Sequence, residues 1–314
     1  MNRTAISTLT GGALALLLAA TPAAAAERTV SERGAMPADG QVSIENIAGS
    51  VKVVGWDRDE ISVTGTLGDD VERLDFSAGA RASVEVVYKE RHARKNGVVR
   101  NLLGDGDDAG KGGGADLTVQ VPRGCHLEVE VVAAGVDVSG LDGEIEVTSV
   151  SGGVDVRGAC RRLEIECVSG NVEVDGAGRQ TEVGTVSGNL KVRCDDAALE
   201  LETVTGEATV DCANLRSLEA NTVNGTITLS GRPARGAVIE AESVNGSLTV
   251  AVPGDVGADF EVTTFNGGIE NAFGQKPTRT DRYTPGEELR PTVTVGEAEV
   301  RLNTLNGRIR ILKK

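Results

Sequence analysis

Eight glutamates recur at nearly regular spacing, and they are the residues of this sequence best suited to binding chemistry. They are Glu128, Glu146, Glu164, Glu182, Glu200, Glu219, Glu240 and Glu261, and the first five follow one another at intervals of 18 residues. Carboxylate oxygens are the ligands that Ca²⁺ prefers, and a row of them would also attract a basic partner. The same row would serve to keep a protein surface soluble and unaggregated. A divalent-cation site and a solvating acidic face are both consistent with this pattern.

Five cysteines form the second set of reactive residues, and two of them share the spacing of the glutamates. The five are Cys125, Cys160, Cys167, Cys194 and Cys212, of which the last two are 18 residues apart. If these two lie on stacked strands, their separation of about 4.8 Å falls within the disulfide range of about 4.4–6.8 Å, although parallel side chains would strain the bridge. A Cys194–Cys212 disulfide and a stacked pair of buried thiols both remain open.

The composition excludes several other kinds of chemistry. The sequence has 47 acidic and 32 basic residues, a net charge of −15, one Trp, two Tyr, four Phe and two His. Nucleic acid is excluded as a partner, because phosphates need basic side chains and bases stack on aromatic rings. So few histidines leave little for general-base or metal catalysis. We expect no enzyme and no cofactor apart from Ca²⁺. A polysaccharide-active enzyme on a β-helix is the weakest alternative, because sugar sites usually offer aromatic platforms.

The glutamates belong to a repeat of about 18 residues that must position them. Each copy contains one glycine, at Gly152, Gly170, Gly188, Gly206, Gly225, Gly246, Gly267 and Gly307. Apolar and polar residues alternate on both sides of the glycine, which is typical of half-buried strands. An apolar residue two positions before each glycine interrupts the alternation, so we expect the chain to bend there, with the glycine as the residue that bends at the least steric cost. The Ser, Thr or Asn directly before the glycine is expected to hydrogen-bond within the turn or to its neighbours.

Two short strands and a turn cannot bury an apolar face alone, so the copies must stack. The sequence therefore predicts an all-β fold, a single-chain β-solenoid (β-helix-like) of stacked coils of about 18–21 residues. A β-propeller needs blades of about 40 residues, and a β-sandwich does not repeat its sequence. A thin core of Val, Ile and Leu also explains why aromatic residues are scarce.

The chain divides into an export signal, a lead-in and the repeat domain. Residues 1–26 combine Arg3, the apolar run ALALLLAA and an Ala-rich end before Glu27, which indicates a secretory signal peptide. Residues 27–40 form the lead-in, and residues 41–314 form the solenoid, with irregular insertions near 89–116 and 272–289, the second before a closing coil at Gly307. No later stretch is apolar enough for a transmembrane span. We expect export to the periplasm or the cell exterior.

The repeats TVSGNLKV and TVNGTITL, with DLTVQVP before the first regular coil and LNTLNGRIRI at the end, resemble a known family. It is the bacterial β-strand-repeat family of unknown function that is labelled "putative adhesin", and the resemblance covers roughly residues 41–312. It implies an exported β-solenoid without catalytic residues. The leading hypothesis is a non-enzymatic adhesion or interaction surface in the cell envelope, binding an unknown protein or envelope component. The alternative is a divalent-cation-binding envelope protein that uses the glutamate face.

Overall fold

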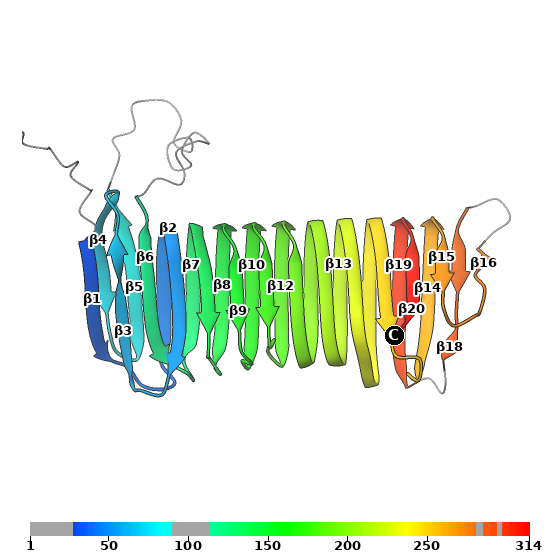
Figure 1. The fold of residues 1–314 in the computed structure, drawn as a ribbon, viewed down its shortest axis with the longest axis horizontal. Coiled ribbons are helices and arrows are strands. Elements are labelled where there is room, and N and C mark those ends of the chain that lie inside the picture. Colours follow the sequence, from blue (N-terminus) through cyan, green and yellow to red (C-terminus); the bar gives the residue numbers. More distant parts are fainter. Residues whose placement is uncertain (1–27, 90–112, 281–284, 294–296) are drawn as a thin grey trace, which may run out of the picture.

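The computed structural model describes residues 28–89, 113–280, 285–293 and 297–314, and within these ranges the chain forms strands and no helix. The strands stand side by side in one elongated stack (Figure 1). Among the described residues, no helix has the length and apolar character needed to cross a membrane. The predicted signal peptide and residues 90–112 of the first insertion lie outside the described part of the chain.

Twenty strands make up the stack within the described ranges. Their bounds are β1 (Arg28–Ala35), β2 (Gln41–Trp56), β3 (Glu60–Leu67), β4 (Val71–Ser77), β5 (Arg81–Tyr88), β6 (Ala115–Pro122), β7 (His126–Ser139), β8 (Glu144–Ser151), β9 (Val154–Arg157), β10 (Arg162–Ser169), β11 (Val172–Asp175), β12 (Gln180–Ser187), β13 (Leu190–Val252), β14 (Ala258–Asn266), β15 (Ile269–Asn271), β16 (Thr278–Arg279), β17 (Glu287–Leu289), β18 (Thr292–Val293), β19 (Ala298–Asn306) and β20 (Ile309–Lys313). The long β13 runs without interruption through several consecutive coils.

The middle of the stack consists of parallel coils with the predicted period. Each coil contributes a long strand that ends before the repeat glycine and a short strand that follows it, as β10 and β11 do. In the long-strand stack, Glu164 of β10 lies opposite Glu146 of β8 and Glu182 of β12. In the short-strand stack, β11 pairs in parallel with β9 and β13. The predicted β-solenoid is therefore confirmed.

The core is aliphatic and is shared by the two strand stacks. In the coil around Gly170, Leu163 and Ile165 of β10 and Val172 and Val174 of β11 are almost completely buried. Equivalent aliphatic residues of the other coils join them in one continuous cluster. Side chains at the alternate positions point outward, because successive residues of a strand face opposite sides. The glutamates, six before each glycine, are on this outward side.

The repeat glycines form a column in which successive turns approach each other closely. A Cβ atom on Gly206 would overlap the carbonyl oxygen of Gly188, and one on Gly188 would overlap that of Gly170. Both residues also have positive φ, 146° and 153°, which side-chain-bearing residues rarely adopt. Backbone hydrogen bonds cross the same gap, with the Gly188 amide donating to Thr205 at 3.2 Å. The coil spacing at this edge therefore depends on the missing side chain.

The last coil of the sequence is not the last coil of the stack. Strand β19 pairs in parallel with both β13 and β14 and lies between them (Figure 1). In register, Asn306 therefore lies between Asn245 and Asn266. The expectation that the Gly307 coil closes the stack is wrong. The reason is that β17 and β18 fold back along β14 as antiparallel strands and occupy its outer edge. The end of the chain therefore enters between the two preceding coils.

The other end of the solenoid is built in a similar way. Strand β2 lies between β7 and a coil made of two pieces, β5 beside its first half and β6 beside its second half. Strand β3 then pairs with β6, and β4 pairs with β5, both in antiparallel orientation. Strand β1 in turn pairs antiparallel with β3. Antiparallel strands thus cover β5 and β6 at one end of the parallel coils and β14 at the other, which protects these edges from pairing with other chains.

Replacing Gly188 with alanine is expected to lower the free energy of unfolding by about 2–3 kcal/mol, because the new methyl group meets the Gly170 backbone at a positive φ. Urea unfolding followed by circular dichroism measures this change. The control is Gly184→Ala in the same coil, where an added Cβ has free space up to the Ile165 carbonyl oxygen at 4.0 Å. Equal stability of the two variants would contradict the close stacking of the glycine turns.

Candidate functional site

Eight large apolar side chains form an exposed column along the solenoid, here called the aliphatic column. In stack order they are Val150, Val168, Val186, Val204, Val223, Val244, Leu305 and Phe265, and each is between 40% and 52% exposed. They are the residues two positions before the repeat glycines. With eight members about 4.8 Å apart, the column is about 34 Å long.

The expected bend lies at the repeat glycine, as at Gly152 and Gly170, and not at the apolar residues two positions before it. Strands β8, β10 and β12 continue through them and end at the following serine. Val168 therefore lies on the outward side of β10, in phase with Glu164 and Glu166. Cys167, the residue before Val168, points inward and is buried. A small residue occupies the equivalent position in each of the other coils of the aliphatic column. The break in the alternation of apolar and polar residues is only apparent, because the inward residue (Cys167) and the outward residue (Val168) are both uncharged.

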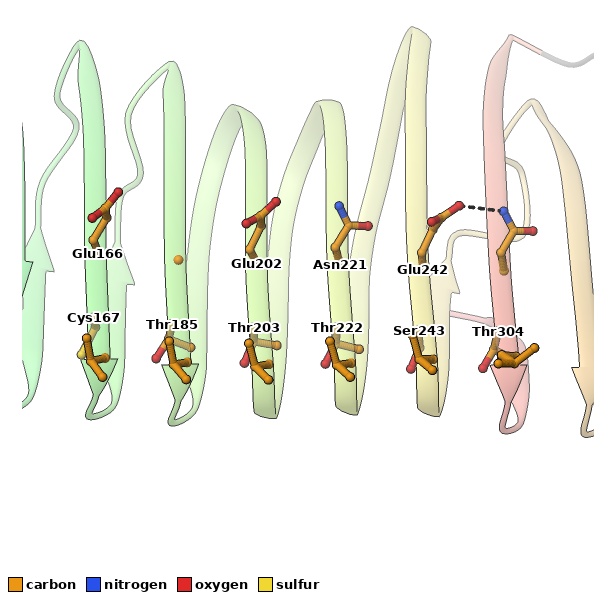
Figure 2. A pocket seen from close by; sticks show the side chains of 18 of the residues that line it. Glu166, Cys167, Thr185, Glu202, Thr203, Asn221, Thr222, Glu242, Ser243 and Thr304 are labelled. Carbon is orange, nitrogen blue, oxygen red and sulfur yellow. Dashed lines mark hydrogen bonds between the residues drawn. The ribbon is translucent and has the colours of Figure 1, made fainter. Parts of the chain in front are cut away.

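The aliphatic column forms one side of a long groove with a volume of about 900 Å³. The floor consists of the small buried residues three before the glycine, and the other side consists of the residues four before it. Figure 2 shows these two rows running side by side across the strands, with Glu166, Glu202, Asn221 and Glu242 in the outer row. The outer row is linked where the Asn303 amide donates to Glu242 at 3.1 Å. The groove is therefore apolar on one side and partly acidic on the other.

The floor of the groove is a row of small side chains beneath the glycine turns. Its members are Ser149, Cys167, Thr185, Thr203, Thr222, Ser243, Thr264 and Thr304. Within the described part of the chain, the hydroxyls of six of them, all but Cys167 and Thr264, have no hydrogen-bond partner. A Cβ built on Gly246 would lie only 2.9 Å from the Ser243 hydroxyl. The floor residues are thus small because the turn is close, and their polarity contributes little.

The predicted glutamate row lies on the same outer face, beside the groove. Glu128, Glu146, Glu164, Glu182 and Glu200 are direct neighbours in register along the stack. Partial burial, followed by the charges of Glu182 and Glu219, raises the pKa of Glu200. A smaller hollow of about 270 Å³ extends over this row from Arg162 to Glu240. The face beside the aliphatic column therefore carries a concentrated negative charge.

Two arginines interrupt the negative charge of this row, Arg162 beside its third and fourth glutamates and Arg301 near its C-terminal end. Arg162 contacts Glu164 at 3.0 Å and Glu182 at 3.8 Å. Arg301 lies between Glu240 and Glu261 in register, and its guanidinium donates to Glu240 at 2.6 Å. Glu261 pairs with Arg290 from the C-terminal excursion at 2.8 Å. The inserted coil thus separates the last glutamate from the others.

The hypothesis of a Ca²⁺ site on the glutamate row stays a prediction. Within the described ranges, no group of three or more His, Cys, Asp or Glu residues is arranged to hold a metal ion. Stacked glutamates supply carboxylates along a line, whereas Ca²⁺ takes six to eight oxygens gathered around a point.

All five cysteines are buried free thiols in the structure. Interaction with the neighbouring Cys212 thiol, followed by burial, raises the pKa of Cys194. The choice between a Cys194–Cys212 disulfide and a stacked pair of buried thiols stays a prediction. Burial raises the pKa of Cys160 to about 11 and that of Cys125 to about 12. Burial likewise raises the pKa of Cys167 in the groove floor. These three thiols are held protonated and are poorly suited to act as nucleophiles.

The side of the aliphatic column facing the turns is uncharged. The residues directly before the glycines form the predicted column of Ser, Thr and Asn, and its asparagines are linked in a ladder. The Asn245 amide donates to Asn224 at 3.0 Å, Asn306 to Asn245 at 2.9 Å, and Asn266 to Asn306 at 3.0 Å. The aliphatic column therefore lies between a neutral ladder on one side and carboxylates on the other.

Residues 25–311, nearly the whole chain, match the model of the family described as Toastrack DUF4097. None of the curated proteins is significantly similar to this chain in sequence.

Several solved structures are similar over most of the chain, at low identity. A protein from Bacteroides fragilis described as a "putative adhesin" is 12% identical with a TM-score of 0.40, covering 92% of this chain and 99% of that one. A "putative cell adhesion protein" from Clostridium sporogenes is 9% identical with a TM-score of 0.23, covering 91% and 100%. A "putative lipid binding protein" from Parabacteroides distasonis is 10% identical with a TM-score of 0.38, covering 91% and 97%. At these values the similarities say nothing about a ligand.

Replacing Thr203 with valine is expected to keep the free energy of unfolding unchanged or to raise it by up to about 1 kcal/mol, because a methyl group of the same size replaces a buried hydroxyl that has no partner. Urea unfolding of the two proteins measures the difference. Thr228→Val on the outward side of a short strand serves as the control. A loss of more than about 1 kcal/mol at Thr203 would show that its hydroxyl is needed and that the floor is more than small packing.

Proposed function

The chain belongs to the Toastrack DUF4097 family, and on that premise we propose that it is an exported, non-enzymatic interaction protein of the cell envelope. Its working surface is the groove beside the aliphatic column, and adhesion to an envelope component is its role. The observation that carries the proposal is the unbroken exposure of eight large apolar side chains along one face. Soluble proteins rarely expose continuous apolar patches larger than a few hundred Å² unless the patch binds a partner.

The composition of the groove supports binding rather than catalysis. Its hydroxyls lie in the floor without a neighbouring histidine, and the thiol of Cys167 is held protonated by burial. A hydroxyl or thiol nucleophile needs an adjacent base or a lowered pKa. The same few side-chain types recur in every coil, which gives a long uniform surface and no single reacting centre. Such a surface suits an elongated partner.

The N-terminal sequence supports a location outside the cytoplasm. Residues 1–26 have the positive start, short apolar run and small-residue end of a secretory signal. Removal of this segment would leave a mature chain beginning at Glu27, shortly before β1. The exposed acidic and apolar columns would then face the envelope.

The triple variant Val168→Thr, Val186→Thr, Val204→Thr tests the proposal, because it keeps the shape of the groove and removes its apolar character. The mature wild-type protein is expected to sediment with isolated cell envelopes, and the variant is expected to lose at least nine tenths of this binding. The control is Thr209→Ser, Thr228→Ser, Thr249→Ser on the outer side of the short strands, which is expected to bind normally.

The same preparation tests export, since the protein recovered from the envelope fraction should begin at Glu27. Full envelope binding by the groove variant, with unchanged circular dichroism, would overturn the proposed surface. A native protein that stays in the cytoplasm with residues 1–26 attached would overturn the proposed location.

A further inference from the structure

The occupant of the groove must bind to a sheet face and not to a sheet edge. The backbone groups of the long strands are already paired between coils, as the parallel registers of β8, β10 and β12 show. Antiparallel strands cover β5 and β6 at one end of the solenoid and β14 at the other. A partner therefore cannot add as a further strand along the groove, and it must bind through side chains.

The repeat distance of the aliphatic column favours a helix over an extended peptide. The column presents one apolar side chain about every 4.8 Å, whereas an extended chain places its same-side residues about 6.6–6.8 Å apart, so the two repeats fall out of step. A helix with apolar residues at intervals of three and four presents a continuous stripe, which needs no exact register. A helix of about 22 residues would match the column of about 34 Å at 1.5 Å per residue.

The charge beside the groove determines the character of that helix. Glu166, Glu202 and Glu242 line the groove on one side, and the row containing Glu182 and Glu200 lies beyond them. The Asn ladder on the other side is uncharged. A matching helix therefore carries basic residues along one flank of its apolar stripe. A second copy of this chain, with its own net charge of −15, and an anionic lipid surface are both repelled by the same carboxylates.

We propose that the groove binds a cationic amphipathic helix of about 22 residues, laid along the solenoid axis with its apolar stripe on the aliphatic column and its basic flank toward the glutamates. This inference rests on the proposed function and specifies the chemistry of its partner. Helix and groove are joined by apolar contact and by charge, so loss of either should weaken binding. Because the groove repeats coil by coil, recognition depends on amphipathic pattern and length and not on one exact sequence.

The probe is a synthetic 22-residue peptide of leucine and lysine, about six turns long, with the leucines on one helical face and a fluorescent label at its N-terminus. Fluorescence anisotropy with the mature protein at physiological salt measures its affinity. A scrambled peptide of the same composition and an amphipathic peptide with glutamate in place of lysine are the matched controls. We expect binding of the cationic amphipathic peptide, at least tenfold weaker binding of the scrambled peptide, and no binding of the acidic one.

Two protein variants separate the contributions of the groove. Val168→Thr, Val186→Thr, Val204→Thr and Glu166→Gln, Glu202→Gln, Glu242→Gln are each expected to weaken binding at least tenfold, the second with a reduced dependence on salt. The short-strand control Thr209→Ser, Thr228→Ser, Thr249→Ser should bind as the wild type does. Equal affinity for the scrambled peptide, or unchanged affinity of both groove variants, would overturn the helix proposal.

The other occupants are tested in parallel. Sedimentation with phosphatidylglycerol vesicles and the oligomeric state by light scattering are expected to show no lipid binding and a monomer. Groove-dependent vesicle binding or dimerisation would replace the helix as the occupant. If envelope binding depends on the aliphatic column but the peptide fails to bind, the proposed function stands and the helix proposal falls. If envelope binding is also unaffected by the groove variant, both fall.

Discussion

The close approach of the repeat glycines is the constraint on which the rest of the structure depends. Gly188 and Gly206 have no room for a Cβ, so each turn rests directly on the backbone of its neighbour. The floor residue three positions earlier must be small, because its hydroxyl lies against the same turn. Strand alternation then places the next residue outward, where Val186 and its equivalents are exposed. The groove is thus a consequence of how the coils stack. Its apolar side depends in addition on the large apolar residues at the outward position next to the floor.

The charge distribution has a different origin, since nothing in the core requires a row of carboxylates. Stacked like charges repel, and the raised pKa of Glu200 records that repulsion together with partial burial. The row is tolerated because its members are exposed or half-buried and stay in contact with solvent, which screens them. Arg301 lies between Glu240 and Glu261 only because the last coil is inserted. The glutamates from Glu128 to Glu240 are left in consecutive coils as an acidic strip beside the groove, with Arg162 paired to Glu164 and Glu182 within it.

Much of the fold could be predicted from the sequence because each coil repeats the same local pattern. The period, the two strands, the aliphatic core and the Asn ladder follow from one-dimensional spacing alone. Coil order could not be predicted, because β19 satisfies the same pattern at either edge of β14 and the choice depends on where β17 and β18 fold. The aliphatic column was present in the sequence as the residue two before each glycine. The exposure of the aliphatic column is hard to predict, because the inward residues beside it, Thr203 and its equivalents, are polar. Strand alternation counted from the glutamates does place the column on the outward side.

The central claim is that one face of the solenoid, the groove beside the aliphatic column, meets the partner in the cell. A photoreactive amino acid placed at Val186 in the groove, or at Thr228 on the outer side of the short strands, tests this claim most directly when the full chain is cross-linked in its native cells. We expect a cross-linked partner from position 186 and none from position 228. Cross-linking from position 228 alone would contradict the claim, and so would the absence of any product at 186 from protein that is folded and exported.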